Sequence, residues 1–169
     1  GSTILPQIID ELQKNGSDNP LVIVGMALVV IAMSFKIAIV PFHMWTPDVY
    51  TGAPTPVTGF LSAAAKAAGF AVFVRVLLTG IPLEGANWQN IFWMLAVLSM
   101  TVGNLMALRQ SEVKRMLAFS SIAHAGYVMV AVVVGSTSAI SGVIFYSFAY
   151  AVMGTGAFGI LTIKDAGRV

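Results

Sequence analysis

The sequence contains no cysteine and carries very little charge. Without cysteine the chain has no disulfide framework, no thiolate metal site and no catalytic thiol, and the redox compartment cannot be inferred from thiol usage. Charged residues make up only 9% of the 169 residues, and a net charge of +2 is too small to mark a nucleic-acid-binding surface. We therefore expect no nucleic-acid partner, and no metal or other cofactor bound by this chain.

Apolar side chains are what the sequence has in abundance. They make up 57% of the residues, and the mean hydropathy of +0.87 is far above that of a soluble domain. A helix needs about 20 apolar residues to cross the hydrocarbon core of a bilayer. The stretches of this length are residues 21–46, 57–79, 90–108, 116–135 and 139–163. The sequence therefore predicts an all-α fold, a polytopic transmembrane helical bundle with five spans in the lipid bilayer.

We expect three parts along the chain. Apolar residues recur at helical spacing in residues 1–20 before the turn sequence NGSDNP, which predicts a surface amphipathic segment and linker; a solvated connector helix accounts for the pattern equally well. Residues 21–163 are predicted to form the transmembrane bundle and residues 164–169 a cytoplasmic tail. Because Gly1 replaces an initiator Met and no basic signal-peptide region follows, we expect a segment of a longer protein.

Basic residues are distributed unevenly between the two sides of the predicted bundle. One side carries Arg109, Lys114, Arg115, Lys164 and Arg168, whereas the other side carries only Lys14. Cytoplasmic loops of membrane proteins are enriched in Lys and Arg, and aromatic rings gather at the interfaces. We therefore predict that loop 109–115 and the C-terminal tail are cytoplasmic, that Ser111 caps the helix after this loop, and that Trp45 anchors at the same interface.

Two lysines, Lys36 and Lys66, are predicted deep within the spans. A charge at the bilayer centre costs at least about 2.5 to 3.5 kcal/mol, so intramembrane lysines usually serve a function. Arg75 lies near a span end, where its long side chain can extend to water, and it is predicted to anchor there. Counted at the helical rise per residue, both lysines lie about 14 Å from the cytoplasmic end and His124 about 12 Å. Three ionisable groups at one depth on three spans predict a polar track parallel to the membrane plane.

Simpler interpretations of these residues are also consistent with the sequence. The three groups can be unrelated and separately hydrogen-bonded, and for His124 this interpretation is as good as the track. His43 is better interpreted as a hydrogen-bonded interface histidine than as a link to the cytoplasm. No Asp or Glu lies within the five stretches, so any carboxylate partner of the lysines is expected from outside this chain. A buried lysine changes its protonation state readily, as a proton relay requires, and a relay is the hypothesis we favour.

Pro41 predicts a break in the first span, which is therefore expected to be discontinuous. Proline has no N–H to bond the carbonyl of Ile37, and it pushes Val40 out of the α region. We expect the helix to break between Lys36 and Phe42. Lys36 then lies on the last turn of a half-helix, where unpaired carbonyls and the helix dipole favour an ammonium group. An ordinary proline kink is the alternative, but it does not account for a lysine placed just before the break.

The stretch FKIAIVPFHMWTPDVYTGAPTPV, residues 35–57, closely resembles the seventh-helix region of the antiporter-like membrane subunits of respiratory complex I, NADH:quinone oxidoreductase. Its TPDVY and GAP elements are similar to the N-type subunits of bacteria. The resemblance continues through SAAAKAAGFAVFVR and GNLMALRQSEVKRMLAFSSIAHAGYVMV, and it covers residues 21–163. It implies a larger fourteen-helix antiporter-like fold with two inverted five-helix repeats, of which this chain contains helices seven to eleven.

The resemblance also implies roles for individual residues. Lys36 and Lys66 match the family's channel lysines on the seventh and eighth helices, His124 matches its tenth-helix histidine, and Pro41 matches its helix break. The family's glutamate and lysine on the fifth helix, and its ionisable residue on the twelfth, are not in this chain. A proton path formed by this chain alone is therefore incomplete.

The same resemblance implies a proton-translocating, non-redox subunit of an enzyme complex in the bacterial cytoplasmic (inner) membrane. Other membrane subunits of complex I are the implied partners, and NADH, quinone, flavin and iron–sulfur clusters are handled by other subunits. Subunits of multi-subunit cation/proton antiporters and membrane-bound hydrogenases share the lysines and the break but usually differ in the TPDVY stretch, so they are the alternative. A bundle whose lysines only hold helices together is a third interpretation.

Overall fold

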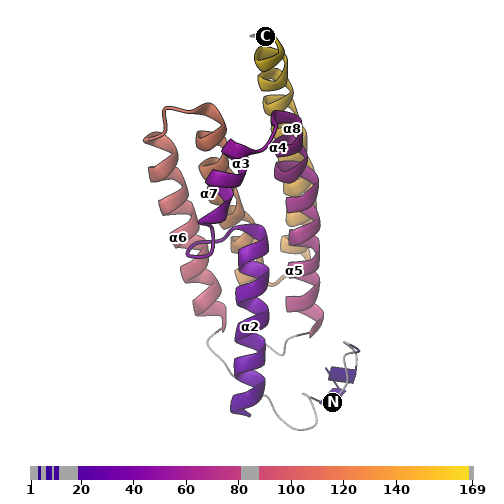
Figure 1. Ribbon diagram of the computed structural model, residues 1–169. Helices are drawn as coiled ribbons and strands as arrows, with labels where there is room; N and C mark the ends of the chain where they lie inside the picture. Colours follow the sequence, from indigo (N-terminus) through magenta and orange to yellow (C-terminus); the bar gives the residue numbers. More distant parts are fainter. Residues whose placement is uncertain (1–3, 5–6, 9, 12–18, 81–87, 168–169) are drawn as a thin grey trace.

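The computed structural model describes residues 4, 7–8, 10–11, 19–80 and 88–167. Every regular element in these ranges is a helix, as predicted (Figure 1). In chain order they are α2 Pro20–Ile37, α3 Trp45–Gly52, α4 Thr55–Phe60, the π-helix η1 Leu61–Ala65, α5 Lys66–Gly80, α6 Trp88–Leu108, α7 Val113–Val134 and α8 Thr137–Ala166. Most of the predicted amphipathic segment and Arg168 lie outside the described residues.

The number of membrane-spanning helices agrees with the prediction. Five helical stretches within the described residues are long and apolar enough to cross a membrane, and α4, η1 and α5 together form one of them. Their bounds are Pro20–Ile37, Thr55–Leu77, Trp88–Leu108, Val113–Val134 and Ser138–Ala166. The prediction of Ser111 as a helix cap is wrong, because Glu112 is the N-cap of α7 and its side chain makes no capping hydrogen bond. Helix α8 continues to Ala166, so Lys164 lies on its last turn.

Helices α6 and α7 form a closely packed antiparallel pair (Figure 1). A Cβ added at Gly103 of α6 would lie 2.6 Å from the backbone nitrogen of Ala123, and one added at Gly126 of α7 would lie 2.9 Å from the carbonyl oxygen of Ala96. Small residues allow membrane helices to approach in this way, so that their backbones come into van der Waals contact. Helix α3 packs against α7 of this pair.

The first span is broken where Pro41 predicted. Helix α2 ends at Ile37, and Ala38 caps it in the left-handed conformation with φ 60° and ψ 49°. The left-handed region costs a non-glycine residue roughly 1–2 kcal/mol. Non-helical backbone then continues to Met44, the N-cap of α3, and the bond between Val40 and Pro41 is cis. The break between Lys36 and Phe42 is therefore confirmed, and it extends slightly beyond the predicted interval.

The polar backbone groups of the break find partners in neighbouring elements. The N–H of Val40 donates to Oγ of Ser99 on α6 at 3.0 Å, and this hydroxyl donates in turn to the carbonyl of Leu95 at 2.7 Å. The indole of Trp45 donates to the carbonyl of Phe35 in the last turn of α2 at 2.9 Å. Irregular backbone within a membrane span is tolerated only where protein or water supplies such partners. Ser99 and Trp45 therefore stabilise the break.

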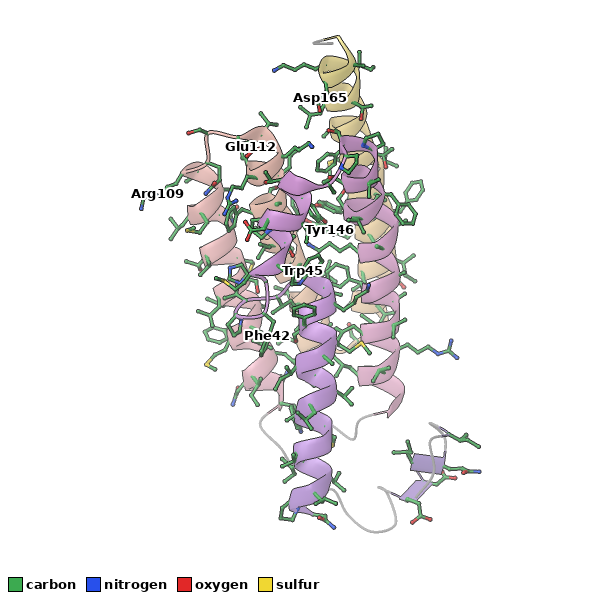
Figure 2. The ribbon with its side chains drawn as sticks, in the orientation of Figure 1. Phe42, Trp45, Arg109, Glu112, Tyr146 and Asp165 are labelled. Atoms are coloured by element: carbon green, nitrogen blue, oxygen red, sulfur yellow. The ribbon has the colours of Figure 1, made fainter. Side chains whose placement is uncertain are left out.

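Helix α3 is also attached to the end of the bundle where α8 ends. Arg115 of α7 forms an ion pair with Asp48 at 2.9 Å, and Lys114 donates to the carbonyl of Ala53 at 3.0 Å. The hydroxyl of Thr55 at the start of α4 donates to Asp165 at 2.6 Å. Figure 2 shows Asp165 and Glu112 near this end, well away from Trp45. The contacts of Asp48 and Ala53 fix α3 against α7, and the contact of Thr55 fixes the start of α4 against α8.

Replacing Gly103 with Ala is expected to destabilise the protein by about 1–3 kcal/mol, because the added methyl overlaps the backbone of α7. Gly142→Ala on α8 is the matched control, since a Cβ there meets nothing within 4 Å and alanine favours a helix. Thermal unfolding of the purified full-length protein in detergent measures both effects. Equal midpoints for the two variants would show that α6 and α7 do not pack this closely.

Replacing Ser99 with Ala leaves the buried N–H of Val40 without its acceptor and is expected to cost about 1–3 kcal/mol. Ser34→Ala is the control, because Ser34 is equally buried and its hydroxyl has no hydrogen-bond partner among the described residues. The same unfolding measurement distinguishes them. The assignment of Ser99 is contradicted if both variants lose the same stability.

Candidate functional site

Lys66 is a buried lysine at the junction of the π-helix and α5. Only 6% of it is exposed, and its ammonium group donates to the carbonyl oxygen of Ser121 on α7 and, at 2.9 Å, to the hydroxyl of the same residue. Single π turns inside α-helices often accompany functional positions. Both acceptors are neutral, so the ammonium is hydrogen-bonded without being neutralised by these contacts.

Two small cavities meet at Lys66. The first, which we call the lysine-side cavity, has a volume of about 40 Å³. Lys36, Thr46 and Lys66 are among the residues that line it. The second, the histidine-side cavity, is lined by Lys66, His124 and Tyr146 among others and offers about 10 Å³. A water molecule needs roughly 10–15 Å³ by this measure. The first cavity can therefore hold a few waters and the second about one.

Each cavity is lined by a residue whose hydroxyl lacks a partner among the described residues. Thr46 lines the lysine-side cavity and Ser147 the histidine-side cavity, and the hydroxyl oxygen of each is buried. Buried hydroxyls are normally hydrogen-bonded, and leaving one unpaired is costly. Buried waters usually occupy spaces of this size beside polar groups that lack a protein partner.

Lys36 differs from Lys66 in its surroundings. It lies on the last turn of α2, as predicted, and its side chain is exposed at the surface of the described bundle while also lining the lysine-side cavity. The structure therefore brings Lys36 and Lys66 to one cavity from two different spans. Pro41 itself is exposed and lines neither cavity, so its contribution is the break that ends α2.

His124 of α7 is half-buried and surrounded by tyrosines. Its Nδ1 is hydrogen-bonded to the hydroxyl of Tyr146 on α8. Its ring centroid lies 4.7 Å from that of Tyr150 and 5.4 Å from that of Tyr127, the latter in an edge-to-face arrangement. The three sequence-predicted ionisable residues are thus arranged in the order Lys36, Lys66, His124. Lys36 and Lys66 share one cavity, and Lys66 and His124 share the other. His43 is buried in the break and lines neither cavity.

Sequence reasoning missed several residues of this site. Ser121 lies three positions before His124 and therefore on the same helix face, so a polar residue at that spacing was a usable signal. Tyr146 and Tyr150 are four positions apart on one face of α8. The hydrogen bond from the indole of Trp45 to the carbonyl of Phe35 at the end of α2 was not predicted either.

The described residues contain no group of three or more His, Cys, Asp or Glu side chains that could hold a metal ion. The groups that the structure does bring together are ammonium, imidazole, phenol and aliphatic hydroxyl. These groups can donate, accept and pass protons.

Known membrane proteins resemble this chain in sequence and in fold. The family model described as the transmembrane region of NADH:quinone oxidoreductase and Mrp antiporters matches residues 1–167. The chain is 52% identical over 151 residues to NADH-quinone oxidoreductase subunit N of Trichlorobacter lovleyi, covering 89% of this chain and 31% of that protein. It is 49% identical over 158 residues to NAD(P)H-quinone oxidoreductase subunit 2 of Thermosynechococcus vestitus, covering 94% of this chain and 30% of that protein.

Two solved membrane complexes contain similar chains. A chain of the archaeal membrane-bound sulfane sulfur reductase is 32% identical, with a TM-score of 0.75 over 81% of this chain and 28% of that one. A chain of the Mrp complex of a Dietzia species has a TM-score of 0.82 over 94% of this chain and 29% of that one, and at 21% identity it supports the fold alone.

The chain spans about a third of the length of these relatives. The family match extends over nearly the whole chain, and the relatives named subunit N share about half of their aligned residues with it. The chain therefore belongs to the family of antiporter-like transmembrane subunits found in NADH:quinone oxidoreductase and Mrp antiporters.

Proposed function

We propose that this chain forms part of a proton-translocating membrane subunit of NADH:quinone oxidoreductase, and that Lys36, Lys66 and His124 relay protons along the membrane plane. One observation carries the proposal: Lys66 borders two cavities, of which one reaches Lys36 and the other reaches His124. A single buried side chain is thus in a position to exchange protons on both sides.

The environment of Lys66 suits this role. An ammonium group has three donors, and the contacts with Ser121 involve the carbonyl and the hydroxyl. The contacts hold the nitrogen in place without pairing it with a carboxylate. Burial disfavours an unpaired charge, so the lysine can release its proton and take up another.

Water is the proposed carrier between the fixed groups. Thr46 and Ser147 each line one of the cavities and carry a buried hydroxyl without a partner among the described residues, and we propose water in the cavities as that partner. The break after Ile37 contributes by placing Lys36 on the last turn of α2, in the lining of the lysine-side cavity. Protons then move by short steps between side chains and waters.

The setting of the relay follows from the family. We propose that NADH oxidation, quinone reduction and their cofactors belong to other subunits, with this chain embedded beside other membrane subunits in the bacterial inner membrane. We propose that residues 109–115 and the end of α8 lie on the cytoplasmic side, because they carry Arg109, Lys114, Arg115 and Lys164. An Mrp-type antiporter subunit is the alternative, and the higher identity to subunit N relatives favours the oxidoreductase.

Lys66→Met is expected to lower the number of protons translocated per NADH oxidised, because methionine fills a similar volume but cannot carry a proton. Loss of a positioned proton-transfer group slows transfer on the order of 100-fold. Dye quenching in membrane vesicles, with NADH oxidation measured in parallel, gives this ratio for the assembled complex.

Lys164→Met is the control for this variant, since Lys164 is exposed on the last turn of α8 and borders neither cavity. It is expected to pump normally. A fully assembled Lys66→Met complex with an unchanged proton ratio would refute the relay. A subunit that never copurifies with NADH-oxidising activity would favour the antiporter alternative.

Thr46→Val is expected to slow proton translocation, because the isosteric apolar side chain removes the hydroxyl of a residue that lines the lysine-side cavity and so disfavours water there. Thr51→Val is a matched control on the same helix: its hydroxyl also lacks a partner among the described residues, but it does not line this cavity. Initial pumping rates in vesicles compare the two. Equal rates would exclude water in this cavity as the carrier.

A further inference from the structure

The hydrogen bond between Tyr146 and His124 lies beside the three side chains of the proposed relay. Three tyrosine rings contact the imidazole: Tyr127, Tyr146 and Tyr150. Among the hydrogen bonds of the described residues, only the hydroxyl of Tyr146 meets a nitrogen of this ring. The hydroxyl of Tyr127 instead accepts from the amide of Asn104 at 3.4 Å. Figure 2 shows Tyr146 at mid-height in the bundle.

A histidine has two ring nitrogens, and the partner of one decides what the other can do. The bond to Tyr146 occupies Nδ1, which leaves Nε2 as the nitrogen available for exchange with the histidine-side cavity. If Nδ1–H donates to the tyrosine oxygen, Nε2 has a free lone pair and can accept a proton. After protonation Nδ1–H still donates to the same oxygen, so this bond persists through the whole cycle.

The opposite arrangement does not survive protonation. If the tyrosine hydroxyl donates to Nδ1, Nε2 already carries hydrogen and cannot accept another proton. The proton must then bind at Nδ1, and this requires the O–H bond of the tyrosine to rotate away from that nitrogen first. The arrangement with Tyr146 as the acceptor therefore lets the imidazole gain and lose a proton without rotating.

We propose that Tyr146 is a positioning residue for proton relay through His124, holding the imidazole by Nδ1 so that Nε2 exchanges protons through the histidine-side cavity. This inference rests on the proposed relay and adds a residue to it. The groups facing Tyr146 are His124 and Tyr127 on α7, Tyr150 on its own helix, and Lys66 across the cavity. Of these, Lys66 supplies the proton that reaches Nε2.

Tyr146→Phe tests the proposal, because it removes the hydroxyl and keeps the ring. In the assembled complex we expect the rate of proton translocation to fall on the order of 10-fold. Tyr127→Phe is the matched control: it removes a hydroxyl from another ring that contacts His124 but is not bonded to it. That variant is expected to translocate protons at the rate of the unmodified complex.

A double-mutant cycle separates positioning from a purely structural role. If Tyr146 acts through His124, Tyr146→Phe has no further effect on translocation in a His124→Ala complex. Additive losses, or equal losses in the Tyr146 and Tyr127 variants, would overturn the proposal. If Lys66→Met and His124→Ala both reduce translocation while Tyr146→Phe does not, the positioning role fails and the relay stands. If His124→Ala has no effect, the relay through His124 fails as well.

Discussion

The site depends on one constraint: an ammonium group buried in an apolar bundle must find oxygen acceptors. Lys66 finds them in Ser121 of the neighbouring helix, where one residue supplies two oxygens. Leaving that ammonium unpaired would cost far more than any single packing contact contributes. The remaining features of the site, including the two cavities and their unpaired hydroxyls, are arranged around this fixed nitrogen.

The backbone N–H groups of the broken span also need oxygen acceptors, because the helix no longer supplies them. Ser99 on α6 accepts a hydrogen bond from the N–H of Val40, and Ser121 on α7 accepts one from Lys66. The closely packed α6–α7 pair therefore provides both acceptors. The contacts at Gly103 and Gly126 fix the distance between these two helices. Close packing of α6 on α7 thus sets the positions of Ser99 and Ser121, the acceptors for polar groups of two other spans.

Much of this architecture was predictable from local sequence. Apolar length defined the spans, and Pro41 located the break because its effect on the backbone is intrinsic. Lys36 and Lys66 stood out because charge is rare in such spans. Ser99 and Ser121 did not, since serines without a partner among the described residues, such as Ser34, occur in other spans, and only tertiary packing distinguishes them. The π turn before Lys66 and the tyrosines around His124 have the same origin in packing between helices.

The contact between Lys66 and Ser121 involves a main-chain carbonyl as well as a hydroxyl. Evolution can exchange the side chain at position 121, but no such exchange deletes the carbonyl. A substitution at position 121 therefore leaves one acceptor for the lysine in place, and it changes only the contribution of the side chain.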